Sequence, residues 1–278
     1  MNIIDGKLLA QRTNQLTQKE VTNFKNTNGR PPKLSVILVG NNPASEIYVA
    51  SKQKKCKELG IESAVIKFNT NVSETQLLKT IKQLNTDKLT DAILVQLPLP
   101  EGLDAYKITN SISPQKDVDG LTDANLGKLT SKHYGIIPCT AHGILKMLEG
   151  KDVRGKNAVV VGRSLLVGKP IATLLTNLDA TVTLCHSKTK NLEKIVQKAD
   201  ILVVAIGQPR FIKKVKKGAI VIDVGINRVD DKLCGDVDFE SVKNIAREIT
   251  PVPGGVGPMT IAMLMHNTLL CANNNVNS

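Results

Sequence analysis

Short runs of apolar, mostly β-branched residues alternate along the chain with longer stretches of helical periodicity. Several of these runs are continuously apolar, as expected for strands that are buried on both faces of a parallel sheet. Strand alternating with helix is typical of an α/β fold with right-handed crossovers. The pattern predicts strands at residues 34–40, 63–69, 91–100, 157–163, 181–187, 201–207 and 219–227.

The helices between these strands have recognisable ends. Asn42 followed by Pro43 predicts the start of a helix, because Asn caps helices and Pro suits the first helical position. Gly60 predicts the end of the same helix. A second start is predicted at Ser73, since Ser73 and Gln76 have the spacing of a capping box.

The strands fall into two sets, which predicts two α/β domains. Three strands precede residues 113–129, a stretch rich in turn-forming residues, and at least four strands follow it. We therefore expect a first, catalytic domain at residues 1–139, completed by a C-terminal helix at 260–278. A second, Rossmann-type domain is expected at 140–259, with the ligand site in the cleft between the two domains.

Composition excludes several classes of protein. The 278 residues contain no apolar run near the ~20 residues that cross a bilayer. The N-terminal sequence lacks the pattern of a signal peptide. The five cysteines are widely spaced and never form a CxxC pair, which predicts reduced thiols in a cytoplasmic protein. The four histidines show no ligand spacing, so we expect no metal site.

The formal net charge of +12 raises the alternative of a nucleic-acid-binding protein. However, the lysines are spread along the chain, and aromatic residues that could stack on bases make up only 3% of it. Solvated helix faces are the simpler interpretation of this charge. We expect neither nucleic acid nor a membrane as a partner.

The turn after the apolar run "NAVVV" (residues 157–161) has features of a dinucleotide site. Gly162, Ser164 and Gly168 lie between this run and a predicted helix, and Pro170 suits the first turn of that helix. Glycine lets the backbone approach a pyrophosphate, and a helix N-terminus offers free N–H groups. The spacing is G-x-S-x-x-x-G instead of G-x-G-x-x-G, so an ordinary glycine-rich turn remains an alternative.

The next strand favours NADP over NAD. An NAD site carries an acidic residue about 20 residues further on, which binds the ribose 2′-hydroxyl. Here the strand ends in Ser187 and Lys188 instead. A hydroxyl and a cation suit a 2′-phosphate, and Arg163 in the preceding turn can join them.

Polar residues in the first domain form a second candidate site. Tyr48 and Lys52 are four residues apart, so they share one helix face and can meet one ligand. Gln96 follows the apolar run "AILV" of the third predicted strand, at the carboxyl end where α/β proteins bind ligands. Asp117 and Asp119 lie in a turn. Residues 250–260, "TPVPGGVGPMT", form a loop too irregular for a simple linker.

Together these segments carry a resemblance to a known family. The chain resembles bifunctional methylenetetrahydrofolate dehydrogenase/methenyltetrahydrofolate cyclohydrolase over essentially its whole length. One departure is Ala141, where the family usually has proline. The matching segments, in order, are "YVASK", "VQLPLP", "KDVDGL", "IPCTAHG", "VVVGRSLLVGKP", "TVTLCHSKT", "VIDVGIN", "GDVDF" and "TPVPGGVGPMT".

The resemblance implies a folate site in the first domain. Tyr48 and Lys52 match the residues that face the folate at its reacting carbon. Gln96 matches the glutamine that holds the lysine and touches the ligand. Asp119 matches the aspartate that binds the pterin ring, and Pro258 lies in a loop that borders the folate.

The resemblance also implies the cofactor and the assembly. A homodimer that uses NADP and acts in one-carbon metabolism is expected. A shikimate-type dehydrogenase with two domains and its own lysine is the nearest alternative among enzymes. The residues that match NADP-binding positions are Gly162, Arg163, Ser164, Ser187 and Ile226.

The chemistry assigns a role to Lys52 without the family. Hydride transfer from 5,10-methylenetetrahydrofolate leaves a stabilised cation and needs alignment more than a base. Hydrolysis of the resulting methenyl cation to 10-formyltetrahydrofolate requires proton transfers. Lys52 is the best candidate for these transfers, whereas the Asp119 carboxylate suits hydrogen bonds from the pterin N–H groups. Tyr48 is expected to pack against the folate and orient it.

Overall fold

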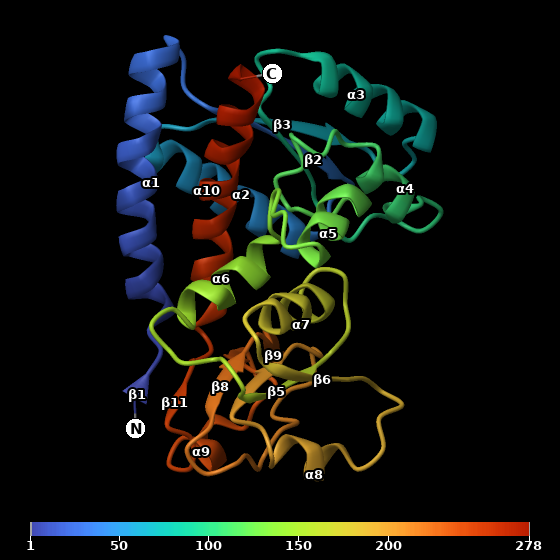
Figure 1. Cartoon of the computed structure of the whole chain (residues 1–278). Coiled ribbons are helices and arrows are strands. Elements are labelled where there is room, and N and C mark those ends of the chain that lie inside the picture. Colours follow the sequence, from blue (N-terminus) through green and yellow to red (C-terminus); the bar gives the residue numbers. More distant parts are fainter. Residues whose placement is uncertain (1, 278) are drawn as a thin grey trace. The chain divides into compact units, whose positions relative to one another are not determined.

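The structure is a computed structural model that describes residues 2–277 (Figure 1). It forms two compact units, which are named here by their sheets. The three-stranded unit comprises residues 12–139 and 263–277, and the six-stranded unit comprises residues 2–11 and 140–262. Residues 2–11, which the sequence assigned to the first domain, therefore cluster with the six-stranded unit. The reason is that Asn2 and Ile3 pair in a sheet with Glu248 and Ile249.

The three-stranded unit is built on a parallel sheet in the order β3-β2-β4. These strands are β2 (Lys33–Val39), β3 (Glu62–Phe68) and β4 (Ala92–Val95), so the first three predicted strands are confirmed. The predicted end of the third was wrong: β4 ends at Val95 and not at Pro100, because Pro98 and Pro100 have no N–H for the sheet. Helices α3 (Glu74–Thr86) and α4 (Ala105–Asn110) supply apolar side chains to the core of this sheet. That core contains Ile37, Val39, Leu77, Ile81, Ile93, Val95, Ile108 and Ile112.

The predicted helix ends in this unit are also confirmed. The side chain of Asn42 accepts a hydrogen bond from the Ser45 N–H at 3.1 Å, at the start of α2 (Pro43–Leu59). Gly60 ends α2 in a left-handed conformation with φ 79°, which glycine adopts without strain. Ser73 caps α3 by accepting a hydrogen bond from the backbone N–H of Gln76 at 3.2 Å.

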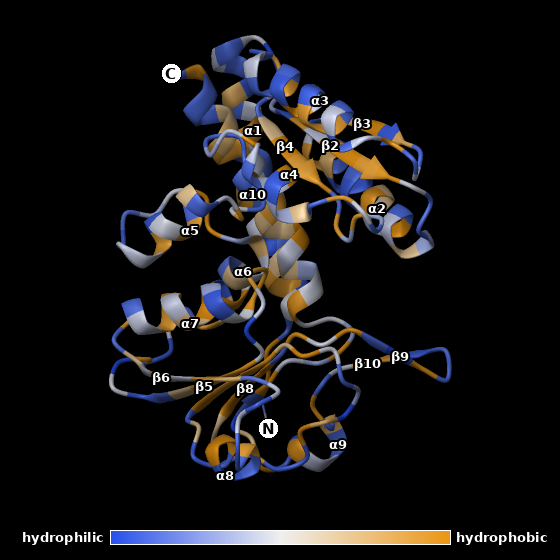
Figure 2. Cartoon of the chain, turned by 90° about the vertical axis from the view of Figure 1, so that its right-hand side faces the viewer, coloured by the Kyte–Doolittle hydropathy of each residue, from blue (hydrophilic) through white to orange (hydrophobic). Residues whose placement is uncertain are grey.

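The six-stranded unit has the order β1-β11-β8-β7-β5-β6, and every neighbouring pair is parallel. The last four predicted strands are confirmed as β5 to β8, although each ends two to four residues before its predicted end. Figure 2 shows β5 and β8 as largely hydrophobic. The order reverses at β5, because β6 lies on one side of it and β7 on the other. Their bounds are β5 (Asn157–Val161), β6 (Thr181–Cys185), β7 (Ile201–Val204) and β8 (Ile220–Asp223).

Several short elements had no signal in the apolar pattern. The edge strands β1 (Asn2–Ile3) and β11 (Glu248–Ile249) contain two residues each, and their pairing brings residues 2–11 into the six-stranded unit. A hairpin of β9 (Asn227–Val229) and β10 (Lys232–Cys234) follows β8.

The remaining helices are α1 (Gly6–Asn28), α5 (Asp123–Thr130), α6 (Cys139–Met147), α7 (Gly168–Asn177), α8 (Leu192–Val196), α9 (Phe239–Val242) and α10 (Val256–Val276).

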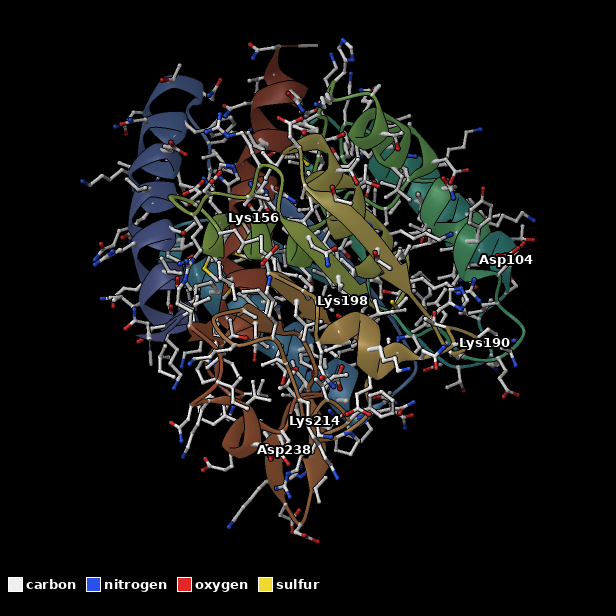
Figure 3. All side chains as sticks on the ribbon, turned by 60° about the horizontal axis from the view of Figure 1, so that its bottom comes forward. Asp104, Lys156, Lys190, Lys198, Lys214 and Asp238 are labelled. Carbon is white, nitrogen blue, oxygen red and sulfur yellow. The ribbon has the colours of Figure 1, made fainter. Side chains whose placement is uncertain are left out.

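The basic residues come from many separate segments. Figure 3 labels Lys156, Lys190, Lys198 and Lys214, which lie before β5, before α8, after α8 and before β8. This distribution agrees with solvated faces as the interpretation of the net charge. Within residues 2–277, none of the helices has the length and apolar character needed to span a membrane.

Candidate active site

Helix α2 presents Tyr48 and Lys52 one turn apart. Tyr48 is 46% exposed, whereas Lys52 is half-buried. The Asn42 cap and the turn at Gly60 fix the two ends of α2. They therefore also fix where along the helix Tyr48 and Lys52 lie. An exposed aromatic ring beside a half-buried cation is a suitable surface for a flat, polar ligand.

Lys52 is held by Gln96, which immediately follows β4. The Lys52 Nζ donates a hydrogen bond to Gln96 Oε1 at 2.9 Å. The Gln96 Nε2 donates to the Leu97 carbonyl oxygen at 2.6 Å. Gln96 is only 8% exposed. Both ends of the amide are therefore engaged, and its oxygen is fixed toward the lysine.

The two aspartates of the 117–120 turn differ in their surroundings. Asp117 is buried, and one of its carboxylate oxygens accepts from the Thr122 N–H at 2.8 Å and from Asn125 Nδ2 at 2.9 Å. Its carboxylate is thus occupied by the turn and by helix α5. Asp119 is half-buried, and the bond that its carboxylate accepts within the described chain comes from the Cys139 thiol at 3.7 Å.

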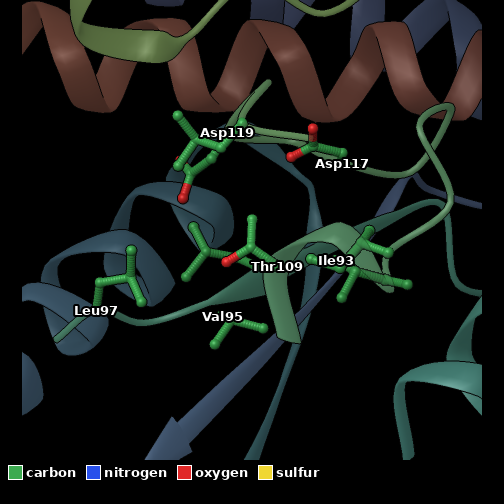
Figure 4. A pocket seen from close by; sticks show the side chains of 9 residues that line it. Ile93, Val95, Leu97, Thr109, Asp117 and Asp119 are labelled. Carbon is green, nitrogen blue, oxygen red and sulfur yellow. The ribbon is translucent and has the colours of Figure 1, made fainter. Parts of the chain in front are cut away.

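Figure 4 shows both aspartates at a small pocket beside the end of β4. Burial raises the pKa of the Asp119 carboxyl, and the negative charge of Asp117 raises it further. The positive charge of Lys52 opposes both effects. Lys52 and Asp119 are therefore within electrostatic range of each other. Apart from the two aspartates, the pocket is lined by Ile93, Leu94, Val95, Leu97, Thr109, Ile112 and Leu121.

Sequence reasoning gave no role to the residues that support Asp119. Cys139 is 5% exposed, and its thiol also contacts the Val118 carbonyl oxygen at 3.4 Å. Asn267 on α10 is fully buried, and its Nδ2 donates to the Val118 and Ile137 carbonyl oxygens at 3.0 and 2.9 Å. The segment "IPCTAHG" contains Cys139, but spacing in sequence gives no sign of the contact with Asp119.

In the six-stranded unit, two glycines of the turn after β5 occupy positions where a side chain does not fit. Gly162 has φ 115°, and a Cβ on it would lie 2.1 Å from the Ala205 carbonyl oxygen. A Cβ on Gly168 would lie 2.0 Å from the Gly162 carbonyl oxygen. The Ser164 hydroxyl oxygen accepts from the backbone N–H groups of Val167 and Gly168 at 3.2 and 3.4 Å. These contacts fix the start of α7.

This turn fits a dinucleotide. It lies at the carboxyl end of β5, where the strand order reverses, which is the position of the ligand crevice in doubly wound sheets. The absence of side chains at Gly162 and Gly168 lets the backbone turn sharply between β5 and α7, where the chain packs closely on itself. The N-terminus of α7 adds positive potential for a pyrophosphate, and its N–H groups at residues 167–169 are bonded to Ser164.

The other predicted cofactor residues lie at the same edge of the sheet or next to it. Arg163 is exposed in the turn itself, and Ser187 and Lys188 are exposed just after β6. Ile226 is 51% exposed after β8, two strands away from β5 in the sheet order. Pro258 is half-buried near the start of α10 and belongs to the six-stranded unit.

Two family models match the chain in succession. One is described as "Tetrahydrofolate dehydrogenase/cyclohydrolase, catalytic domain" and matches residues 4–119. The other is described as "Tetrahydrofolate dehydrogenase/cyclohydrolase, NAD(P)-binding domain" and matches residues 138–276. Between them they cover nearly all of the sequence.

Individual relatives are similar over their full length. The bifunctional protein FolD of Halalkalibacterium halodurans is 53% identical over 274 residues, which are 97% of this chain and 98% of the relative. The crystal structure of the bifunctional enzyme FolD, a methylenetetrahydrofolate dehydrogenase/cyclohydrolase from Campylobacter jejuni, is 46% identical with a TM-score of 0.96 and covers 99% of both chains. The Trypanosoma brucei enzyme, solved with an NADP cofactor and an inhibitor, is 38% identical with a TM-score of 0.95; the match covers 99% of this chain and 98% of that one.

Proposed function

The chain belongs to the tetrahydrofolate dehydrogenase/cyclohydrolase family, and from this premise we propose which of its residues perform each step. The activity is the oxidation of 5,10-methylenetetrahydrofolate to 5,10-methenyltetrahydrofolate and the hydrolysis of that product to 10-formyltetrahydrofolate. Family membership favours this function over the two alternatives, a shikimate-type dehydrogenase and a nucleic-acid-binding protein.

The observation that carries the residue assignment is the hydrogen bond between Lys52 and Gln96 at 2.9 Å, with Asp119 within electrostatic reach of the lysine. Gln96 positions the Lys52 amine, and Asp119 accepts hydrogen bonds from the pterin N–H groups. Tyr48, one turn from Lys52 and exposed, packs against the folate. Pro258 borders the folate in the family, and we extend that role to this chain.

Lys52 serves the hydrolytic step. Water adds to the cationic methenyl carbon and loses a proton as the new C–O bond forms. The bond between that carbon and N5 then breaks. N5 takes up a proton, and the hydroxyl of the adduct loses its own proton to solvent as the formyl C=O forms on N10, so one proton is released overall. An amine held by Gln96 can accept the proton of the attacking water and deliver a proton to N5. The oxidation requires no base, because a hydride leaves the substrate and a stabilised cation remains.

The cofactor is NADP, which accepts the hydride when it is bound. Gly162 and Ser164 would hold its pyrophosphate at the start of α7, and Arg163 and Ser187 would hold its 2′-phosphate. Ile226 would contact it from the end of β8. We accordingly propose that the six-stranded unit binds NADP and that the three-stranded unit carries the folate chemistry. The NADP complex of the Trypanosoma brucei relative supports the choice of cofactor.

We expect catalytic efficiency, kcat/KM, to be at least about tenfold higher with NADP than with NAD, because a charge-assisted bond to the 2′-phosphate contributes more than 1.4 kcal/mol. Steady-state kinetics with both cofactors measure the ratio. The variant Ser187→Asp should lower the ratio of kcat/KM with NADP to kcat/KM with NAD, since a carboxylate repels the 2′-phosphate. Lys190→Ala changes the net charge equally at a nearby exposed position and is the matched control. Equal efficiencies in the unmodified protein would reject the assignment.

Two further proposals concern assembly and location. A homodimer is supported by the family resemblance alone, and light scattering on the purified protein tests it. A cytoplasmic location is supported by the cysteines, because all five are free thiols and four of them are buried. Fractionation of the source cells tests the location.

A further inference from the structure

Two buried aspartates in the six-stranded unit have no part in the chemistry described above. Asp223 is the last residue of β8, and Asp236 follows β10; their exposed fractions are 3% and 0%. Among the ion pairs of residues 2–277, none includes either carboxylate. A buried charge without a cation requires several hydrogen bonds in compensation.

Asp236 obtains those bonds from the loop that follows β7. Its Oδ2 accepts from the backbone N–H groups of Ile206 and Gly207 at 2.7 and 3.0 Å. Its Oδ1 accepts from the N–H of Gln208 at 2.8 Å and from Asn227 Nδ2 at 2.9 Å. The Asp236 carboxylate thus accepts hydrogen bonds from three consecutive backbone N–H groups, those of residues 206–208, and from the side chain of Asn227, which follows Ile226.

Asp223 holds Asp236 in turn. Its Oδ1 accepts from the backbone N–H groups of Gly225 and Asp236 at 3.0 and 2.9 Å, and its Oδ2 accepts from that of Val237 at 2.9 Å. Burial raises the pKa of Asp223 to about 6, against the effect of these three donors, and the charge of Asp236 adds to the rise. A Cβ on Gly235 would lie 1.8 Å from Asp223 Oδ2, so only glycine fits there.

The loop held by Asp236 contacts the proposed cofactor site on two sides. Residue 205 begins this loop, and its carbonyl oxygen is the atom that a Cβ on Gly162 would meet at 2.1 Å. Asn227, which donates to Asp236, directly follows Ile226. A Cβ on Gly225, on the other side of Ile226, would lie 2.3 Å from Asp236 Oδ1. The carboxylate therefore connects the loop after β7 to the segment after β8, and the loop after β7 packs on the turn after β5.

We propose that Asp236 is a positioning residue for NADP: it fixes residues 206–208 and 225–227 in the arrangement that receives the cofactor. This inference rests on the proposed NADP site. Because the bonds are to backbone N–H groups, the sequence of the loop is free to vary while its course remains fixed. Asp223 acts indirectly, because its carboxylate holds the backbone N–H groups of Asp236 and Val237 and so fixes the position of Asp236.

The variant Asp236→Asn tests the proposal. It keeps the shape of the side chain but turns an NH₂ group toward N–H donors, so at least one of the bonds is lost. We expect the dissociation constant for NADP, measured by calorimetry without folate, to rise about 10- to 100-fold, as for the loss of bonds to a charged group. Hydrolysis of methenyltetrahydrofolate without NADP should stay within about twofold of the unmodified protein. Hydrogen exchange at residues 206–208 should accelerate.

Asp230→Asn is the matched control, because Asp230 is exposed in the turn between β9 and β10. It should leave the NADP affinity unchanged. If Asp236→Asn does not fold, Asn227→Ala removes a single donor to the same carboxylate and should weaken NADP binding by about threefold or more.

The outcomes separate the inference from the proposed function. Failure of the unmodified protein to bind NADP would reject both. Normal NADP binding by the unmodified protein, together with unchanged affinity in Asp236→Asn, would reject the inference alone. The inference is also rejected if Asp236→Asn fails to fold and Asn227→Ala binds NADP normally. A parallel loss of hydrolysis and NADP affinity in a folded variant would assign Asp236 to general stability instead.

Discussion

Purified Lys52→Met protein should lose cyclohydrolase activity by about 10²- to 10⁴-fold, the usual effect of removing an acid–base group. It should still reduce NADP at a measurable rate with 5,10-methylenetetrahydrofolate, because hydride transfer needs no base. Methenyltetrahydrofolate should therefore accumulate, visible by its absorbance, with little conversion to 10-formyltetrahydrofolate. Methionine preserves much of the length of the lysine stem and leaves the packing of α2 intact.

The decisive quantity is the ratio of the two activities in one preparation of Lys52→Met. Some loss of dehydrogenase activity agrees with the account, since Lys52 also orients the ligand together with Gln96. Lys54→Met is the matched control, because Lys54 is exposed on the same helix. If both activities of Lys52→Met fall by the same factor, Lys52 is a binding residue and the proton travels by another route.

The variant Asp119→Ala should weaken folate binding by about 2–4 kcal/mol, as expected when a bound ligand loses a charged hydrogen-bond partner. This corresponds to roughly 30- to 1000-fold in the dissociation constant of the folate. NADP binding should be nearly unchanged, because the proposed cofactor residues follow β5, β6 and β8 of the other unit. Calorimetry with each ligand separately measures both effects.

Two further variants make this measurement more specific. Asp119→Asn keeps the shape of the side chain and removes its charge, so it isolates the contribution of the carboxylate. Glu101→Ala removes an exposed carboxylate from the same unit and should change neither affinity. Weakened NADP binding with unchanged folate binding in Asp119→Ala would reverse the assignment.

The fold was predictable to the extent that it depends on local patterns. The strands β2 and β5 are buried on both faces of parallel sheets, so they appear in the sequence as continuous apolar runs. Asn42 and Gly60 mark the ends of α2 by side-chain and backbone chemistry that acts within a few residues. The edge strands β1 and β11 were missed because a strand of two residues contains no period.

The candidate site was predictable in its members but not in its contacts. Lys52 and Tyr48 are linked by helical spacing, whereas Lys52 and Gln96 are 44 residues apart and meet only when β4 lies beside β2. The family resemblance supplied that pairing. The contact of Cys139 with Asp119 and the bonds of Asp236 to residues 206–208 also join distant segments. No local sequence pattern predicts these contacts, since the sequence does not show whether an acidic residue is buried or exposed.

The central claim is that this one chain performs oxidation and then hydrolysis, and a single coupled assay tests it most directly. Purified protein is mixed with NADP and 5,10-methylenetetrahydrofolate, and the absorbance of NADPH and of methenyltetrahydrofolate is followed together with the yield of 10-formyltetrahydrofolate. The account predicts that NADPH forms only when the folate is present and that 10-formyltetrahydrofolate appears in equal amount. The absence of folate-dependent NADPH formation, or NADPH formation with no 10-formyltetrahydrofolate beyond the uncatalysed amount, would contradict it.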